Sequence, residues 1–184
     1  IIKQNALSIG IGVVHEDKID EVNILEATMI AMREAVEDLN ITPDLILVDG
    51  NMKDITDIPQ KNIIKGDSKS FSIAAASIIA KVTRDRMMIQ YDTIFPEYGL
   101  ANNMGYGTKQ HMSAISLHFS TPIHRQSFRP ISDYMPTYKD IRDIGVLSIE
   151  IAATEMVKSG HKIIQIKDQS LKIIDILSSF NGKY

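Results

Sequence analysis

Hydrophobic and polar residues alternate along this chain in patterns that predict both strands and helices. Leucine, isoleucine and valine alternate with serine and glycine over 7–13, which is typical of a β-strand with one face of small residues. Apolar residues recur every three or four positions from 22 to 39. This spacing predicts an amphipathic helix whose N-cap is Asp20 or Asn23.

Two short apolar runs each lead to an aspartate. Residues 45–48 predict a buried central strand that delivers Asp49 to its carboxyl end, where open α/β sheets bind ligands. Residues 62–65 predict another strand, after which Gly66 permits a turn that presents Asp67. A helix rich in alanine follows, so the predicted fold class is α/β.

The end of the chain predicts one more helix and two more strands. The pattern over 140–159 predicts a helix that Gly160 stops. Residues 161–166 and 171–177 each predict a strand. Together they form an αββ unit.

Composition fits an ordinary soluble protein. The 184 residues are 44% apolar and 23% charged, which predicts one domain, or one domain with a piece of another. We expect the main domain over 1–135, and the αββ unit over 140–184 as a buttressing extension or the start of a second domain. The absence of cysteine excludes disulfides and thiolate zinc sites and fits a cytoplasmic protein. Because no apolar run could cross a bilayer, we expect no membrane contact. We also expect a monomer.

Charge is distributed unevenly over a chain whose net charge is -3. Residues 61–86 carry six basic and two acidic side chains, and residues 98–132 carry no acidic side chain. Such stretches suit contact with phosphates through cations, hydroxyls and backbone donors. A solvated basic face explains them equally well.

Asp49 and Asp67 are the candidates for chemistry. Mg²⁺ and Mn²⁺ prefer carboxylate oxygens, and both aspartates are predicted at or just after the carboxyl end of a strand. Taken singly, each has a simpler explanation. Asp49 precedes Gly50, which makes a common turn pair, and Asp67 precedes a helix, where an acid caps or stabilises the first turn.

Several motifs occur in the order found in type 2 ribonucleases H. They are Gly10-Ile11-Gly12-Val13, Val48-Asp49-Gly50-Asn51, Lys65-Gly66-Asp67-Ser68-Lys69-Ser70, the helix from Ser72 to Arg86, Gly105-Tyr106-Gly107-Thr108 and Thr121-Pro122-Ile123-His124-Arg125. Over most of residues 6–131 the chain resembles the ribonuclease HII family. The resemblance implies a ribonuclease H-like mixed sheet flanked by helices. It also implies metal-dependent hydrolysis of the RNA strand, or of embedded ribonucleotides, to 5′-phosphate and 3′-hydroxyl ends.

The resemblance assigns roles to particular residues. Asp49 and Asp67 match two of the family's four metal-binding acids, which hold Mg²⁺ or Mn²⁺. Tyr106 matches the tyrosine that stacks near the junction deoxyribose of an RNA/DNA hybrid or ribonucleotide-containing duplex DNA. By itself, Tyr106 is explained more simply as a half-buried loop tyrosine. Lys69 and Arg125 are candidate phosphate contacts.

Four further residues have lesser roles. Asp85 lies roughly 27 Å from Asp67 along the predicted helix, at ~1.5 Å per residue, so a salt bridge with its neighbours explains it better than metal binding. Lys81 and Arg84 are further candidate phosphate contacts on that helix. His124 is predicted to be structural or to contact the backbone, and a catalytic base is the less favoured alternative.

The chain departs from the family pattern in two places. The family carries an Asp-Glu-Ala-Gly-Arg-Gly segment on its first strand, which supplies two acids and a grip on the 2′-hydroxyl, and this chain has no such segment. Where the family has His-Lys before Gly-Tyr, this chain has Asn103-Met104. We therefore expect an N-terminally truncated fold with weak or no activity by itself, because two carboxylates hold metal poorly.

Two other functions and one fainter resemblance stay open. A chain that keeps the fold and the basic surface without the chemistry would be a hybrid-binding scaffold. A generic Mg²⁺-dependent phosphoryl-transfer enzyme is disfavoured, because the sequence contains no G-x-x-x-x-G-K motif. The tail faintly resembles the start of YraN-like proteins, in which a strand acid is functional, and Asp175 would correspond to that acid.

Overall fold

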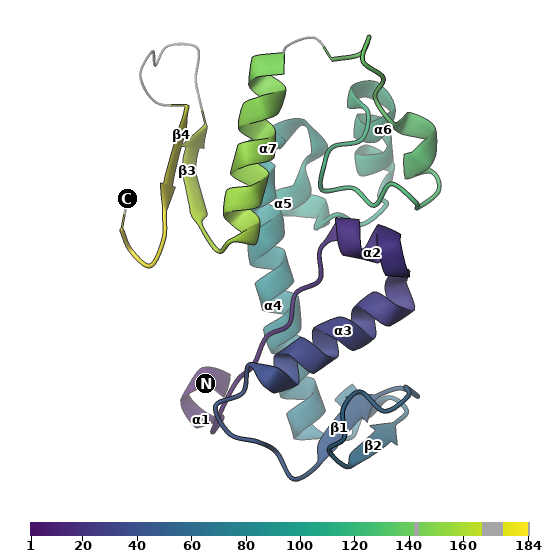
Figure 1. Cartoon of the computed structure of the whole chain (residues 1–184), viewed down its shortest axis with the longest axis vertical. Coiled ribbons are helices and arrows are strands. Elements are labelled where there is room, and N and C mark those ends of the chain that lie inside the picture. The colour runs from purple at the N-terminus through teal and green to yellow at the C-terminus, as the bar shows by residue number, and fades with distance from the viewer. Residues whose placement is uncertain (142–143, 167–174, 184) are drawn as a thin grey trace. The chain divides into compact units, whose positions relative to one another are not determined.

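The computed structural model describes residues 1–141, 144–166 and 175–183 (Figure 1). The chain divides into two compact units, Ile1–Thr83 and Arg84–Tyr184, here called unit 1 and unit 2. Helix α4 (Phe71–Ile94) contributes residues to both. The domain boundary that we expect between 135 and 140 is a different division from that of these two units, and it stays a prediction.

Unit 1 begins with three helices. They are α1 (Ile2–Asn5), α2 (Glu16–Val22) and α3 (Ile24–Glu37). Asn23 caps α3, because its side-chain oxygen accepts hydrogen bonds from the backbone N–H groups of Leu25 at 2.9 Å and Glu26 at 3.2 Å. This confirms the predicted helix and one of its two candidate caps. The other candidate, Asp20, lies inside α2.

The strand predicted over 7–13 is wrong, because residues 8–15 form neither helix nor strand. A strand needs a hydrogen-bonded partner, and none of the described residues pairs with this segment. The segment instead packs against α3 through bare backbone. A Cβ on Gly10 would lie 1.9 Å from the Ala35 carbonyl oxygen, and one on Gly12 would lie 1.9 Å from the Ala31 carbonyl oxygen. The small residues thus serve contact with a helix.

The two strands of unit 1 form a small parallel sheet. Strand β1 (Ile46–Asp49) pairs with β2 (Gln60–Ile63), with Ile46 opposite Gln60 and Asp49 opposite Ile63. Both predicted strands are confirmed, although β2 begins and ends two residues earlier than expected. Within the described chain β1 has one partner strand, and of its side chains only Val48 is buried. The expectation of a buried central strand is therefore corrected to a partly exposed one.

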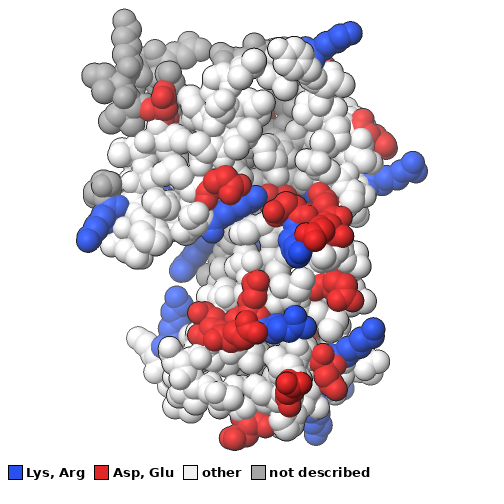
Figure 2. Space-filling view, in the orientation of Figure 1, with Lys and Arg blue, Asp and Glu red and all other residues white. Residues whose placement is uncertain are grey.

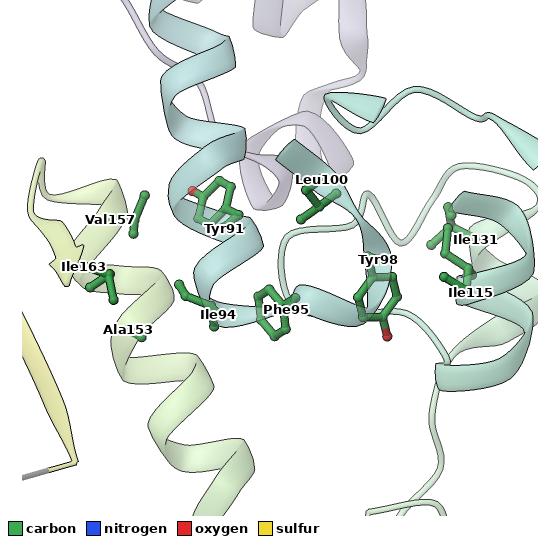
Figure 3. Packing of buried hydrophobic residues seen from close by; sticks show 11 residues of the cluster. Tyr91, Ile94, Phe95, Tyr98, Leu100, Ile115, Ile131, Ala153, Val157 and Ile163 are labelled. Atoms are coloured by element: carbon green, nitrogen blue, oxygen red, sulfur yellow. The ribbon is translucent and has the colours of Figure 1, made fainter. Parts of the chain in front are cut away.

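The core of unit 2 gathers around the end of α4. Its helices are α5 (Leu100–Asn103), α6 (Lys109–His118) and α7 (Ile144–Lys158), with 3-10 turns η2 (Pro96–Tyr98) and η3 (Ile131–Tyr134). In Figure 3, Ile94 and Phe95 lie between Val157 of α7 and Tyr98 of η2, with Ile115 of α6 beyond. These five side chains are at most 5% exposed, so hydrophobic burial holds the elements of unit 2 together.

The αββ unit predicted at the end of the chain is confirmed in its described part. Gly160 follows α7 with φ +86°, a conformation that favours glycine. Strand β3 (Lys162–Ile166) then pairs antiparallel with β4 (Ile176–Ser179). Residues 171–174 of the last predicted strand lie outside the described residues. The chain is thus α/β, with its parallel and antiparallel pairing divided between two small sheets. In the described ranges, no helix has the length and apolar character needed to cross a membrane.

Candidate metal and substrate site

Asp49 lies at the end of β1, beside the turn that leads from β2 toward α4. Its Oδ1 accepts a hydrogen bond of 2.7 Å from the backbone N–H of Gly66. The Gly50 N–H donates to the Ile63 carbonyl at 3.0 Å, which extends the pairing of the strands by one residue. The Asp49 carboxylate is thereby bound to the residue that directly precedes Asp67.

Asp67 lies in the 3-10 turn η1 (Gly66–Ser68). Lys65 enters this turn in the left-handed conformation, with φ 56° and ψ 48°, and its carbonyl accepts a bond of 2.9 Å from the Ser68 hydroxyl. Oδ1 of Asp67 accepts from the Ser68 N–H at 2.8 Å. Because β1 and β2 are parallel, their carboxyl ends meet at one edge, and the structure brings the two predicted carboxylates to that edge.

Gly66 matters here for close packing and not, as the sequence predicted, for a turn conformation, because the left-handed residue of this turn is Lys65. The residue is buried, and a Cβ there would lie 2.6 Å from Cδ1 of Ile73 and 3.4 Å from Oδ1 of Asp49. The missing side chain therefore allows the backbone N–H to reach the carboxylate. In the sequence, the only indication of this close approach was the glycine that directly precedes Asp67.

The two carboxylates suit a hard divalent cation. Both side chains are exposed, and each carboxylate accepts a backbone hydrogen bond through its Oδ1. Mg²⁺ is commonly held by one or two carboxylates, while water and substrate phosphates complete its octahedron. Among the described residues, no three His, Cys, Asp or Glu side chains gather as a metal site. An ion here would draw on two carboxylates at most.

Lys69 directly follows the turn η1 that carries Asp67. Its side chain is exposed, and Nζ donates to the Ile64 carbonyl at 2.7 Å. To contact a phosphate, the ammonium group would exchange this backbone bond for a charge-assisted one. The predicted role of Lys69 stays a prediction.

Tyr106 lies in unit 2, in the loop between α5 and α6. It is 58% exposed, an exposure that fits both a half-buried loop tyrosine and a stacking surface, so its role stays a prediction. Its N–H donates to the Asn103 carbonyl at 2.9 Å, and its carbonyl accepts from the Thr108 N–H at 2.7 Å. The side chain therefore projects from a hydrogen-bonded loop.

Arg125 and His124 are neighbours with different surroundings. Arg125 is partly exposed, and its Cζ lies 4.7 Å from the centroid of the Phe128 ring, a cation–π geometry. His124 is only 8% exposed, and its Nδ1 accepts from the Thr121 N–H at 3.1 Å. The structural role predicted for His124 is confirmed, and the phosphate contact of Arg125 stays a prediction.

His111 of α6 packs against His124, a pairing that no sequence motif indicated. The two rings are stacked with centroids 5.4 Å apart, and their Nε2 atoms are 3.4 Å apart. Nδ1 of His124 accepts from a backbone N–H, so the network assigns its proton to Nε2, which donates to His111. Nδ1–H of His111 then faces the Tyr98 carbonyl oxygen at 3.4 Å. Both rings are neutral in this network.

Burial favours these neutral forms. It lowers the pKa of His111, and burial together with the repulsion that a protonated His111 would exert lowers the pKa of His124 to about 4. Burial is also the main cause that raises the pKa of Tyr98, with the charges of Glu97 and Glu150 adding to it. The Tyr98 hydroxyl donates to backbone carbonyls of residues 118 and 119 at 3.1 and 2.7 Å. Tyr98, His111 and His124 therefore form a buried, hydrogen-bonded polar cluster.

The remaining candidate residues are charged side chains on α4 and directly before β4. Figure 2 shows acidic and basic side chains interspersed over the visible face. Arg84 of α4 donates from Nη2 to the Met104 carbonyl at 3.2 Å. Asp85 is partly buried on α4, and Asp175 is exposed directly before β4. The function suggested for Asp175 stays a prediction.

These features define an α/β protein with two carboxylates at the carboxyl edge of parallel strands. A model of the Ribonuclease HII family matches residues 1–131, a range that includes Asp49, Asp67 and Tyr106. The chain belongs to the ribonuclease HII family. The αββ unit lies outside the matched range.

Several curated ribonucleases HII are similar to this chain. It is 56% identical to that of Listeria innocua over 133 residues, which are 72% of this chain and 51% of the relative. It is 51% identical to that of Enterococcus faecalis over 132 residues, again 72% and 51%. It is 56% identical to that of Clostridioides difficile over 128 residues, 70% and 50%. The chain thus spans about half the length of the curated relatives it matches.

Proposed function

We propose that this chain carries part of the active site of a metal-dependent endonuclease. Its substrates are RNA/DNA hybrids or duplex DNA with embedded ribonucleotides, which it cleaves to 5′-phosphate and 3′-hydroxyl ends. The observation that carries the proposal is the hydrogen bond that joins Asp49 to Gly66, next to Asp67, in a chain of the ribonuclease HII family. A chain without cysteine suits work in the cytoplasm, as a monomer.

Asp49 and Asp67 would hold Mg²⁺ or Mn²⁺ through the carboxylate oxygens that the backbone leaves free. When bound, such an ion would polarise the phosphodiester and activate water. The chain itself supplies placement. The bond from Gly66 holds one oxygen of Asp49, so that carboxylate keeps its orientation without substrate.

Substrate contact would come from cationic and aromatic side chains. Lys69 lies two residues beyond Asp67, where its ammonium could meet a phosphate near the bound ion. Arg125 and Tyr106 would contribute a further phosphate contact and a stacking surface for a sugar. Tyr106 is 58% exposed, which leaves its ring open to a duplex.

A hybrid-binding scaffold without chemistry is the second candidate. It is favoured by the donor set, because the described residues bring no third metal-ligating side chain to Asp49 and Asp67. Two carboxylates bind a divalent ion more weakly than a complete set. We therefore expect the chain by itself to cleave slowly or not at all.

Single-turnover cleavage tests the proposal. The chain, in excess over a labelled DNA duplex with one ribonucleotide, is incubated with Mn²⁺. Any cleavage at the ribonucleotide should be slow, and Asp49→Asn and Asp67→Asn should each abolish it while the circular dichroism spectrum is unchanged. Asp54→Asn is the matched control, because Asp54 is an exposed aspartate between β1 and β2.

Two results would change the assignment. Unaltered cleavage by either of the first two variants would show that the carboxylates do not act as proposed. Binding of the duplex without any cleavage by the unaltered chain would make the scaffold the better description.

A further inference from the structure

One buried amide side chain organises the loop that carries Tyr106. Asn103 is 8% exposed, and its Nδ2 donates to the Tyr98 carbonyl at 2.7 Å. Its Oδ1 accepts from the Gly105 N–H at 2.8 Å, and its own carbonyl accepts from the Tyr106 N–H at 2.9 Å. Asn103 therefore links the backbone of Tyr106 to Tyr98 in the core of unit 2.

Two successive residues of this loop adopt left-handed conformations. Met104 has φ 50° and ψ 30°, and Gly105 has φ +75°. A residue with a side chain rarely adopts this conformation unless its surroundings enforce it. The bond between Asn103 Oδ1 and the Gly105 N–H closes the backbone around Met104. Nη2 of Arg84 donates to the Met104 carbonyl at 3.2 Å. The unusual backbone is thus held at two points.

The loop also packs closely on α4. A Cβ on Gly105 would lie 3.3 Å from Sδ of Met88 and 3.4 Å from Nη2 of Arg84. The backbone beside Tyr106 is therefore in contact with a helix, while Tyr106 itself is 58% exposed. A ring on a fixed backbone loses less conformational freedom on binding than one on a mobile loop.

We propose that Asn103, supported by Arg84, is a positioning residue that presents Tyr106 to the duplex. The inference rests on the proposed function, because it needs Tyr106 to contact substrate. Asn103 would act only through Tyr106, so its loss would weaken discrimination between ribonucleotide-containing and all-DNA duplexes. The carboxylates of unit 1 would be unaffected.

Binding measured by fluorescence anisotropy tests this role without cleavage. The whole chain is titrated into a labelled DNA duplex with one ribonucleotide and into the same duplex made of DNA alone. Discrimination is the ratio of the two dissociation constants. We expect Tyr106→Ala and Asn103→Ala each to lower this ratio roughly fivefold or more, as loss of one stacking contact does. In the Tyr106→Ala background, Asn103→Ala should change nothing further.

Asn102→Ala is the matched control. Asn102 is the exposed neighbour of Asn103, so its variant should keep the discrimination of the unaltered chain. Arg84→Met supplies a second test if Asn103→Ala does not fold, because Arg84 is exposed and its loss frees the Met104 carbonyl. Its effect too should vanish in the Tyr106→Ala background, whereas a phosphate contact by Arg84 would persist there.

Three results would overturn the inference. The first is unchanged discrimination in folded Asn103→Ala. The second is that Asn103→Ala lowers discrimination equally in the unaltered chain and in the Tyr106→Ala background. The third is unchanged discrimination in Tyr106→Ala, which would remove the role of Tyr106 itself. The cleavage test of Asp49 and Asp67 is independent of all three, so failure of the positioning role and failure of the nuclease proposal are distinguishable.

Discussion

Oδ1 of Asp49 accepts a hydrogen bond of 2.7 Å from the backbone N–H of Gly66, and this bond joins the two segments that carry the candidate metal ligands. A carboxylate that accepts a backbone N–H is held in one orientation. Asp67 follows Gly66 directly, so the same turn places the second carboxylate. The site is thus built from local backbone geometry at the edge of two parallel strands.

Gly12→Ala tests the packing of the N-terminal segment on α3. The new Cβ would lie 1.9 Å from the Ala31 carbonyl oxygen, and helix backbone cannot move aside as a flexible side chain can. We expect the free energy of unfolding, measured by urea denaturation, to fall by ~2 kcal/mol or more.

Gly107→Ala is the control for that substitution. A Cβ on Gly107 would meet no atom within 4 Å, so its stability should change by less than ~0.5 kcal/mol. Equal stability of Gly12→Ala and the unaltered chain would mean that the segment does not pack on α3 as described.

The buried histidine pair predicts a loss of stability in acid. The pKa of His124 falls from 6.5 to about 4 on folding, so between these values the unfolded chain binds the additional proton. The contribution of neutral His124 is complete above pH 6.5 and is lost progressively as the pH falls toward 4. The lost stability should reach ~3 kcal/mol.

His124→Asn isolates this contribution, because asparagine does not titrate. Urea denaturation of both proteins from pH 7 to pH 4 should show a shallower pH dependence for the variant. Glu150, whose pKa burial and Glu97 raise to about 6, titrates in both proteins and cancels in the difference. Identical pH dependence of the two proteins would contradict a neutral buried His124.

Thr154→Val should stabilise unit 2. Thr154 of α7 is 1% exposed, and its Oγ1 has no hydrogen-bond partner in the described structure. A buried hydroxyl without a partner costs free energy that an isosteric methyl group does not. We expect the free energy of unfolding to rise by about 1 kcal/mol.

Thr93→Val provides the comparison. Thr93 is exposed, and its hydroxyl donates to the Ile89 carbonyl at 3.4 Å, so this variant should gain nothing. A loss of stability in Thr154→Val would show that its hydroxyl is satisfied in solution.

Local patterns predicted most of the elements correctly. The β1 run, the Asn23 cap and the αββ unit each depend on residues close together in the sequence. The strand expected over 7–13 failed because strand formation requires a distant partner, which periodicity cannot reveal. Its glycines signalled a close approach but not that the neighbour was a helix.

The candidate site was predictable in part for the same reason. Asp49 and Asp67 follow apolar runs that mark strand ends, so their position could be inferred from local pattern. The pairing of His111 with His124 joins α6 to a distant loop, and the sequence contains no periodic signal for it. Asn103 was visible only as a departure from the family pattern, and the hydrogen bonds of its side chain and carbonyl emerge from the folded loop.

Titration of the ¹⁵N-labelled chain with Mn²⁺ tests the central claim most directly, because the paramagnetic ion broadens the amide signals nearest to it. We expect the signals of Gly66 and Ser68 to broaden first. Asp49→Asn should abolish this selectivity, and Asp54→Asn should leave it unchanged. Broadening that begins elsewhere, or that persists unaltered in Asp49→Asn, would contradict a metal site built on Asp49 and Asp67.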